Sequence, residues 1–304
     1  MIAMHHAIFG RRYGETIVIN AVACTTFNMT MTYADGSITV DWGDGTSTTN
    51  SAFNKTYASP FTGTIKITGD LDKVTYFQSI SNTGIYIDLK EFWKFTILNT
   101  LDLRGNCYIN NSVAEIPRVT NTLHLRDLPN LTISGTAIDL PRVTNQLYLN
   151  NLPNLTMTGN AIDLPRVTSI LYLLNLPNLT MSGTAIDLPR VTNQLVLYSL
   201  PNLTMSGSAS DLPLSVDVFI LSIGSTSLTY TALTTKPTTK SRTRIEISTK
   251  FTTTQTDEML IDYATYSTTW NSPKEIKLSS LGRTTSSDAA VATLVSRGVT
   301  ITLL

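Results

Sequence analysis

Four consecutive copies of one 24-residue unit occupy the middle of this chain, and no other feature restricts its fold as strongly. The copies share the consensus PRVTNQLxLxxLPNLTMSGxAIDL. They begin at Pro117, Pro141, Pro165 and Pro189. A second proline series with the same spacing comprises Pro129, Pro153, Pro177 and Pro201. Repeats of this length are typical of proteins in which equivalent units stack, so we expect one core that runs through the stack.

Each copy carries leucines in the pattern LxLxxLxxL; in the second copy these are Leu147, Leu149, Leu152 and Leu155. The first two alternate with other residues, so their side chains lie on one face of a short strand. The last two follow a turn of the chain. Stacked copies place each leucine against its equivalent, and each fully buried leucine contributes about 1.5–3 kcal/mol. The copies show no helical period, so a short strand such as 155–157 is expected on the opposite side.

The segment LDLRGNCYI, residues 101–109, carries an LxLxxN core. It resembles the leucine-rich-repeat family, in which the side chain at the position of Asn106 satisfies backbone groups of the loop. The resemblance implies a mainly β fold with a leucine-rich-repeat solenoid of 24-residue coils over residues 71–242. The regular copies depart from the family because leucine takes that position, in Leu128, Leu152, Leu176 and Leu200. Looser coils are expected around Val74, Tyr76, Ile85, Ile87, Leu89, Phe219, Leu221 and Leu228.

Identical residues at one position of successive copies form rows along such a stack. The arginine row is Arg118, Arg142, Arg166 and Arg190. The aspartate row is Asp139, Asp163, Asp187 and Asp211. We expect these two rows to pair and their charges to cancel, and the alternative is an anion-binding stripe. A third row consists of the asparagines of the Asn-Leu-Thr segments, Asn130, Asn154, Asn178 and Asn202. We interpret these asparagines as a ladder that closes turns, and the alternative is that they are glycosylation acceptors.

The copies differ at positions that alternate with the strand leucines and therefore face outward. The first row of such positions reads Thr122, Gln146, Ile170 and Gln194. A repeating frame with one varied, partly aromatic surface is typical of a binding site. Drift at exposed positions, or contact with a neighbouring subunit, would leave the same pattern. The candidate binding residues come from the other two rows and are His124, Arg126, Tyr148, Asn150, Tyr172, Leu174 and Tyr198.

Residues 14–70 are expected to form a separate small β domain. Its strand-like runs cover residues 15–21, 26–33, 37–42 and 62–68. The segment VDWGDGT, residues 40–46, resembles the WxFGDGT signature of polycystic-kidney-disease-type (PKD) β-sandwich domains, which implies a buried Trp42 and a tight Gly-Asp-Gly turn. Such a turn uses aspartate for backbone hydrogen bonds, so we expect no metal and no cofactor. The calcium ligands considered and set aside are Asp35, Asp41 and Asp44.

Residues 243–304 are expected to form an α/β cap on the solenoid. One helix is predicted from Thr256 and a second from Ser287 to Gly298. The buried stripe of the second helix is predicted to be Val291, Leu294 and Val295. Short strands are predicted at 244–247, 275–278 and 299–303. A terminal unit of different structure is needed because an exposed end would leave unpaired edges and bare leucines.

The composition argues against several classes of function. The 22 basic residues equal the 22 acidic residues, so the basic excess of a nucleic-acid-binding protein is absent. No run approaches the roughly 18 apolar residues of a membrane span, so membrane insertion is not expected. His5 and His6 interrupt the apolar N-terminal stretch, and Arg11 and Arg12 follow it, so a secretory signal is not expected.

The reactive side chains form no known catalytic pattern. Cys24 and Cys107 are far apart and are expected to be ordinary thiols. Two of the three histidines lie at the N-terminus, and His124 is replaced by tyrosine or valine in the other copies. The sequence contains no nucleophile elbow, phosphate loop or zinc-protease motif. We therefore predict that the protein is not an enzyme.

The order of segments also resembles a group of proteins. A VDWGDGT domain precedes leucine-rich repeats and a closing segment RTTSSDAAVATLVSRGVTIT, residues 283–302. This order resembles repeat proteins of tailed bacteriophages and of Bacteroidetes-type bacteria. The resemblance implies a virion tail fibre, head fibre, decoration or receptor-binding protein, with a bacterial cell-surface adhesin as the alternative. The expected partners are other virion proteins, a host surface glycan or protein, and further copies of the chain. Residues 1–13 are considered as an anchor on position alone.

Overall fold

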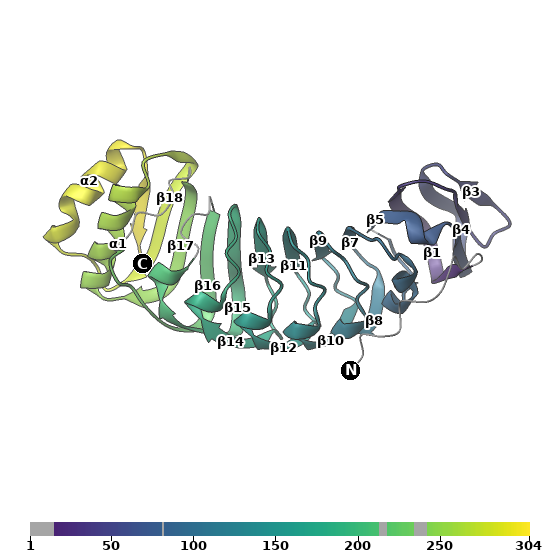
Figure 1. Ribbon diagram of the computed structural model, residues 1–304, viewed down its shortest axis with the longest axis horizontal. Helices are drawn as coiled ribbons and strands as arrows, with labels where there is room; N and C mark the ends of the chain where they lie inside the picture. Colours follow the sequence, from purple (N-terminus) through teal and green to yellow (C-terminus); the bar gives the residue numbers. More distant parts are fainter. Residues whose placement is uncertain (1–14, 81, 213–217, 234–241) are drawn as a thin grey trace.

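The structure is a computed structural model that describes residues 15–80, 82–212, 218–233 and 242–304. The protein is mainly β, and its strands belong to one large sheet. Figure 1 shows an arch with a strand-rich unit at its N-terminal end and helices α1 (Thr253–Tyr266) and α2 (Asp288–Ser296) at its C-terminal end. The segment 1–13, considered as an anchor, lies outside the described residues.

A parallel ladder of strands, here called the inner ladder, runs along the concave side of the arch (Figure 1). Between the regular copies, each residue pairs with the residue 24 positions later, as Leu147 does with Leu171. The three strands predicted for the C-terminal region overlap its last members. In order, the strands are β5 (Val74–Ser79), β7 (Thr100–Arg104), β9 (Thr122–Arg126), β11 (Gln146–Asn150), β13 (Ile170–Leu174), β15 (Gln194–Ser208), β16 (Val218–Thr229), β17 (Arg242–Phe251), β18 (Trp270–Ser280) and β19 (Thr300–Leu303).

A second parallel ladder, the outer ladder, runs along the convex side (Figure 1). It consists of β6 (Ile85–Ile87), β8 (Tyr108–Ser112), β10 (Leu131–Thr136), β12 (Thr156–Asn160), β14 (Thr180–Thr184) and the second halves of β15 and β16. Short 3₁₀ helices turn the chain between strands. They are η1 (Leu71–Lys73), η2 (Leu89–Lys94), η3 (Val113–Glu115), η4 (Ala137–Asp139), η5 (Ala161–Asp163), η6 (Ala185–Asp187), η7 (Ala209–Asp211) and η8 (Thr285–Ser287).

The core lies between the two ladders. Leu147, Leu149, Leu152 and Leu155 are each at most 2% exposed, which confirms the predicted leucine pattern. Strand pairing stacks each copy on the next, so the core is continuous through the copies. The position of Asn106 differs from the expectation because this residue is exposed.

In the regular copies, a residue with a left-handed backbone conformation follows the inner strand, and its N–H group forms the hydrogen bond that holds the loop. Asn151 and Asn175 have φ of 53° and 52°, a region that asparagine tolerates better than most residues. The Asn151 N–H donates to the Leu174 carbonyl at 3.0 Å, and the Asn175 N–H donates to the Tyr198 carbonyl at 2.9 Å. The Asn175 side chain also donates to Asn151 Oδ1 at 3.0 Å. These bonds tie each copy to its neighbours.

The N-terminal end of both ladders is covered by one long strand, β1 (Thr16–Tyr33). Asn20 in its first half pairs with β6, and Met29 in its second half pairs with β5, both antiparallel. The strand bends near Ala23, where φ is 50°. The prediction of two separate strands here was wrong, because the bend interrupts the hydrophobic alternation but not the strand. The other strands of this unit are β2 (Ile38–Asp41), β3 (Ser47–Thr49) and β4 (Phe53–Gly69).

The VDWGDGT segment forms the expected tight turn between β2 and β3. Trp42 is 1% exposed, and its indole donates to Thr48 Oγ1 at 2.8 Å. Asp41 accepts from the Gly43 N–H at 2.9 Å, and Asp44 accepts from the Thr46 N–H at 3.0 Å. These two carboxylates therefore hold the backbone of the turn.

The two helices lie in the connections that follow β17 and β18. Both predicted helices are present, although the first begins at Thr253, before the predicted Thr256. Leu294 is fully buried, but Val295 is 57% exposed, so the predicted buried stripe of α2 was wrong at that residue. None of the described helices is long and apolar enough to cross a membrane.

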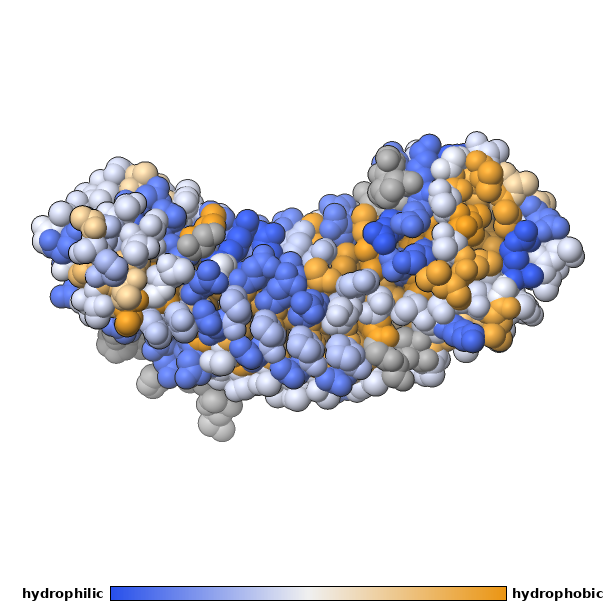
Figure 2. Space-filling view, turned by 180° about the vertical axis from the view of Figure 1, so that it is seen from behind, coloured by the Kyte–Doolittle hydropathy of each residue, from blue (hydrophilic) through white to orange (hydrophobic). Residues whose placement is uncertain are grey.

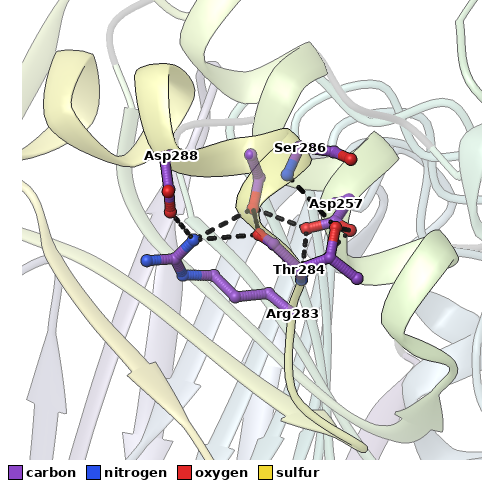
Figure 3. A network of polar contacts seen from close by, with 6 residues as sticks. Asp257, Arg283, Thr284, Ser286 and Asp288 are labelled. Carbon is purple, nitrogen blue, oxygen red and sulfur yellow. Dashed lines mark hydrogen bonds and ion pairs between the residues drawn. The ribbon is translucent and has the colours of Figure 1, made fainter.

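A buried carboxylate joins the beginnings of α1 and α2 (Figure 3). Asp257 Oδ1 accepts from the Thr284 N–H at 3.0 Å and from Ser287 Oγ at 2.5 Å, while Oδ2 accepts from Thr284 Oγ1 at 2.6 Å. Burial raises the pKa of Asp257, but the hydrogen bonds from Ser287 and Thr284 outweigh burial and lower it. The RTTSSD segment is thus fixed by a residue of the preceding helix.

Replacing Asp257 with Asn should destabilise this end of the protein by about 1–3 kcal/mol, because an amide NH₂ then faces a donor. The loss should depend on pH. Since the folded-state pKa is depressed, the stabilisation by Asp257 is complete above the unfolded pKa of about 3.9 and disappears as the pH falls through the folded value. Urea unfolding at pH 7 and at pH 3 measures this. An equal difference between wild type and Asp257→Asn at both pH values would contradict the assignment.

Candidate binding surface

The outward residues of the inner ladder form three rows on the concave side. Strand pairing places Tyr148 between His124 and Tyr172, and places Asn150 between Arg126 and Leu174. Tyr198 continues the second of these rows beyond Leu174. The seven candidate residues therefore lie on one face of four adjacent strands, as the leucine alternation predicted.

Three aromatic rings follow one another along the middle row. The rings of His124 and Tyr148 are 4.4 Å apart, centroid to centroid, in an edge-to-face arrangement. The rings of Tyr148 and Tyr172 are 5.1 Å apart and stacked at 27°. Burial raises the pKa of the Tyr148 hydroxyl. Because neighbouring rings flank Tyr148 on both sides, this residue presents its hydroxyl group and ring edge, and not a free ring face, to a ligand.

A buried carboxylate lies at the N-terminal end of the same row. Asp102 is 3% exposed and accepts from Gln78 Nε2 at 3.0 Å and from Arg104 Nε at 2.8 Å. His124 Nδ1 and Arg126 Nη2 each lie 3.6 Å from Asp102 Oδ2. Burial raises the pKa of Asp102, but the nearby His124 imidazole and the hydrogen bonds from Arg104 and Gln78 outweigh burial and hold the pKa far below its usual range. The carboxylate is therefore ionised and fixes the surrounding side chains.

Arg126 joins this charged cluster to the aromatic row. Its guanidinium carbon lies 5.4 Å from the centre of the Tyr148 ring, a cation–π distance. Among the described residues, Arg126 Nε and Asn150 Oδ1 are buried without a hydrogen-bond partner. Buried polar atoms normally have partners, so a small movement that exposes these two atoms would offer a donor and an acceptor to a ligand.

Beyond Tyr172 the surface becomes more apolar and then charged again. Val196 is 3% exposed, whereas Tyr198 is 41% exposed. Farther along the ladder, Glu246 contacts Arg244 and, at 3.3 Å, Lys277. The concave face thus has a central apolar and aromatic section between two sections of paired charges.

Sequence reasoning missed Gln78, Asp102 and Arg104, which belong to the same surface. Asp102 pairs with His124, only 22 residues later, so a comparison of the 24-residue copies did not include it. The LxL pattern of Leu101 and Leu103 could have revealed Asp102. It places Asp102 between two inward leucines, as Leu147 and Leu149 place Tyr148, and therefore predicts that Asp102 faces the same surface.

The arginine and aspartate rows do not pair as predicted. Arg142 and Arg166 donate to the backbone carbonyls of Asp163 and Asp187, at 3.2 and 2.9 Å. The Asp187 carboxylate accepts instead from the Thr184 N–H at 2.8 Å. An acid at the third position of a 3₁₀ turn reaches the free N–H groups at the start of that turn, which explains the preference. Three members of the asparagine row form hydrogen bonds between copies: Asn154, Asn178 and Asn202 donate to the carbonyls of Pro129, Pro153 and Pro177 in the preceding copy, at 2.7, 2.6 and 2.7 Å.

The other residues considered for chemistry are accounted for as follows. Lys55 forms an ion pair with Asp44 at 2.5 Å, and its hydrogen bond is the main cause that lowers the pKa of Asp44 to about 2. Cys24 and Cys107 are buried free thiols. Within the described ranges, no group of three or more metal-binding side chains is found. His5 and His6 lie outside those ranges.

Comparison of the chain with protein-family models, curated proteins and solved structures gave no match.

Proposed function

We propose that this chain is a leucine-rich-repeat solenoid with a PKD-like unit at its N-terminal end and an α/β cap at its C-terminal end. Two observations support this description. Successive copies contribute one strand to each of two parallel ladders, and the leucines of each copy are buried between those ladders. The domain limits proposed from the sequence are 14–70, 71–242 and 243–304. Hydrogen bonds of β1 to β5 and β6 cross the first limit, so these units share one sheet.

We further propose that the protein is a non-enzymatic structural and binding component of a bacteriophage virion, such as a tail fibre, head fibre or decoration protein. The virion assignment depends on the segment order described under Sequence analysis. The binding assignment depends on one structural observation: the frame repeats, whereas the residues that face away from the leucine core on adjacent inner strands change from Asp102 to His124, Tyr148, Tyr172 and Val196. A host glycan or protein, or a neighbouring virion subunit, is the proposed partner.

The arrangement of the single described histidine supports a binding role more than catalysis. His124 Nε2 lies 3.2 Å from Gln146 Oε1, and Nδ1 faces Asp102. Its ring also contacts Tyr148 edge to face. Asp102 in turn is held by Arg104 and Gln78, so its oxygens already have partners. These groups stabilise one another and form a preorganised polar surface.

Replacing Tyr148 and Tyr172 together with Ala should reduce adsorption of particles to their host by about tenfold or more, because aromatic residues at the centre of an interface commonly contribute 2 kcal/mol or more. The particles should still assemble, since neither tyrosine belongs to the buried leucine core. The measurement is the adsorption rate of particles that carry the variant, together with their protein content.

A matched control is available on the outer ladder. Tyr86 and Tyr108 are also stacked, with ring centres 4.5 Å apart, and each is 39% exposed. Replacing this pair with Ala should leave adsorption unchanged. Equal adsorption by both double variants and wild type would refute the proposed binding face. Loss of particle assembly with the Tyr148 and Tyr172 variant alone would instead indicate contact with a neighbouring virion subunit.

A further inference from the structure

The inner ladder ends differently at its two ends. At the N-terminal end, β1 pairs with β5 and covers the edge. At the C-terminal end the last strand is β19, which pairs with β18 on one side. In the part of the chain that the structure describes, no strand pairs with the other side of β19. Among the described residues, the C-terminal edge of the inner ladder therefore has no strand on its outer side, although a terminal cap was expected to cover it.

The backbone of β19 shows which groups the open edge presents. The Leu304 N–H donates to the Leu278 carbonyl, and the Leu304 carbonyl accepts from the Ser280 N–H, both at 2.9 Å. Residue 304 therefore faces β18. Since the backbone groups of successive residues in a strand point to opposite sides, those of Ile301 and Leu303 face outward. These two residues provide the donors and acceptors of the open edge.

Several apolar side chains are exposed or half-buried at this end of the chain. Ile301 and Leu303 are half-buried and pack against the core, while Leu281 and Leu304 are 61% and 65% exposed. Val295 on α2 is 57% exposed. Figure 2 shows hydrophobic residues gathered over this C-terminal end, at the right of the view. Natural sheet edges are usually protected by charged residues, proline or bulges, but β19 has the uncharged sequence TITL.

We propose that β19 pairs antiparallel with β19 of a second copy of this chain, which makes the protein a two-fold dimer with one sheet running through both copies. A two-fold axis at Thr302 places Ile301 opposite Leu303 of the second copy. Each such pair exchanges two backbone hydrogen bonds, because both residues direct their N–H and C=O groups outward. The half-buried side chains of Ile301 and Leu303 then become covered by the same groups of the partner.

The charges and helices near the edge also fit a second copy. An antiparallel arrangement places α2 beside α2 of the partner with opposite helix directions. The N-terminal end of one helix then lies beside the C-terminal end of the other, so the partial charges of the two helix dipoles are complementary. In the dimer, α2 lies over β18 and β19 of its own copy, and the partner's α2 lies over the same two strands of the partner. Neighbouring strands are about 4.8 Å apart, so the two helices are separated by two strand spacings, or about 10 Å, which is the usual distance between packed helices. Ala289 and Ala292 are exposed on α2 and are small enough for such contact.

Sedimentation equilibrium of the full-length chain tests this proposal, which does not depend on the proposed virion function. The wild-type protein should sediment with twice the chain mass. Leu303→Pro removes an N–H group that points outward from β19 and forms a hydrogen bond only in the proposed dimer. Proline is tolerated at such edge positions, so this variant should be a folded monomer. Thr302→Ala, on the same strand but with its backbone directed to β18, is the matched control and should remain dimeric.

Hydrogen exchange gives a second measurement that needs no variant. The amides of Ile301 and Leu303 should be protected at high protein concentration and should exchange faster on dilution. At a protein concentration of about 100 µM, even a binding free energy of about −5.5 kcal/mol would produce a substantial fraction of dimer. A wild-type protein that is entirely monomeric at that concentration would overturn the proposal. A dimer in which Leu303→Pro has no effect, or a mass that grows beyond two copies with concentration, would also overturn it.

Discussion

A chain that lacks residues 141–164 is expected to remain folded and to unfold cooperatively, whereas a chain that lacks only residues 141–152 is expected to be unfolded or insoluble. The 24-residue deletion joins Leu140 to Pro165 and recreates the Leu-Pro junction of each copy. It removes β11 and β12 together, so one strand is lost from each ladder. Because stability in a stack is approximately a sum over neighbouring copies, the shorter chain keeps equivalent contacts at every junction.

The shorter deletion removes β11 but leaves β12. The inner ladder then lacks a strand that the outer ladder retains, and the leucines of the truncated copy lose their partners. Leu→Ala changes at buried positions cost about 2–5 kcal/mol each, so the loss of Leu147, Leu149 and Leu152 from one copy is comparable to the whole stability of a typical domain. Circular dichroism and thermal unfolding of both chains measure the difference. Unfolding of both chains, or of neither, would contradict the equivalence of the copies.

Replacing Asp102 with Ala is expected to lower the free energy of unfolding by about 2–3 kcal/mol, the largest effect predicted for a single substitution on the concave face. The change leaves Arg104 and Arg126 close together without a counter-ion and Gln78 without an acceptor. Breaking a fully buried ion pair costs about 3–5 kcal/mol. The Arg104 side chain is 35% exposed, so water partly compensates its charge and the expected loss of stability is smaller.

Urea unfolding of Asp102→Ala, Arg104→Met and the double variant separates the contributions. The double variant should be less destabilised than the sum of the single variants, because removing Arg104 also removes part of the unpaired charge. Additive effects would show that Asp102 and Arg104 do not stabilise each other. The Asp102→Ala protein should also show a disturbed Tyr148 environment, since Arg126 contacts both groups.

The regular copies were predictable because one physical rule applies to each of them. Alternation of Leu147 and Leu149 fixed which residues lie inside, and therefore placed Tyr148 and Asn150 outside. Separate signals, namely capping residues and a terminating glycine, predicted the two helices of the C-terminal region.

Features that depend on irregular contacts could not be predicted. Asp102 escaped notice because its copy is shorter than the regular unit by two residues, as its pairing with His124 shows. The continuity of β1 through Ala23 depends on tertiary pairing with β4, β5 and β6, which local propensity does not encode. Asp163 and Asp187 accept hydrogen bonds from the N–H groups at the start of their own turns, and the neighbouring arginines donate to backbone carbonyls instead. Val295 is exposed because no described element covers that side of α2.

The central claim is that each regular copy advances the chain by one strand spacing, and electron-spin distance measurements test it most directly. Spin labels at the exposed positions Asn99 and Asn193 are separated by four copies along the inner ladder, because Asn99, Asn121, Asn145, Ser169 and Asn193 follow one another in hydrogen-bonded register. At about 4.8 Å per strand, their backbones should be about 19 Å apart, and about 14 Å apart in the chain that lacks residues 141–164. A shortening of about one strand spacing supports the account, and an unchanged or much larger change in distance would contradict it.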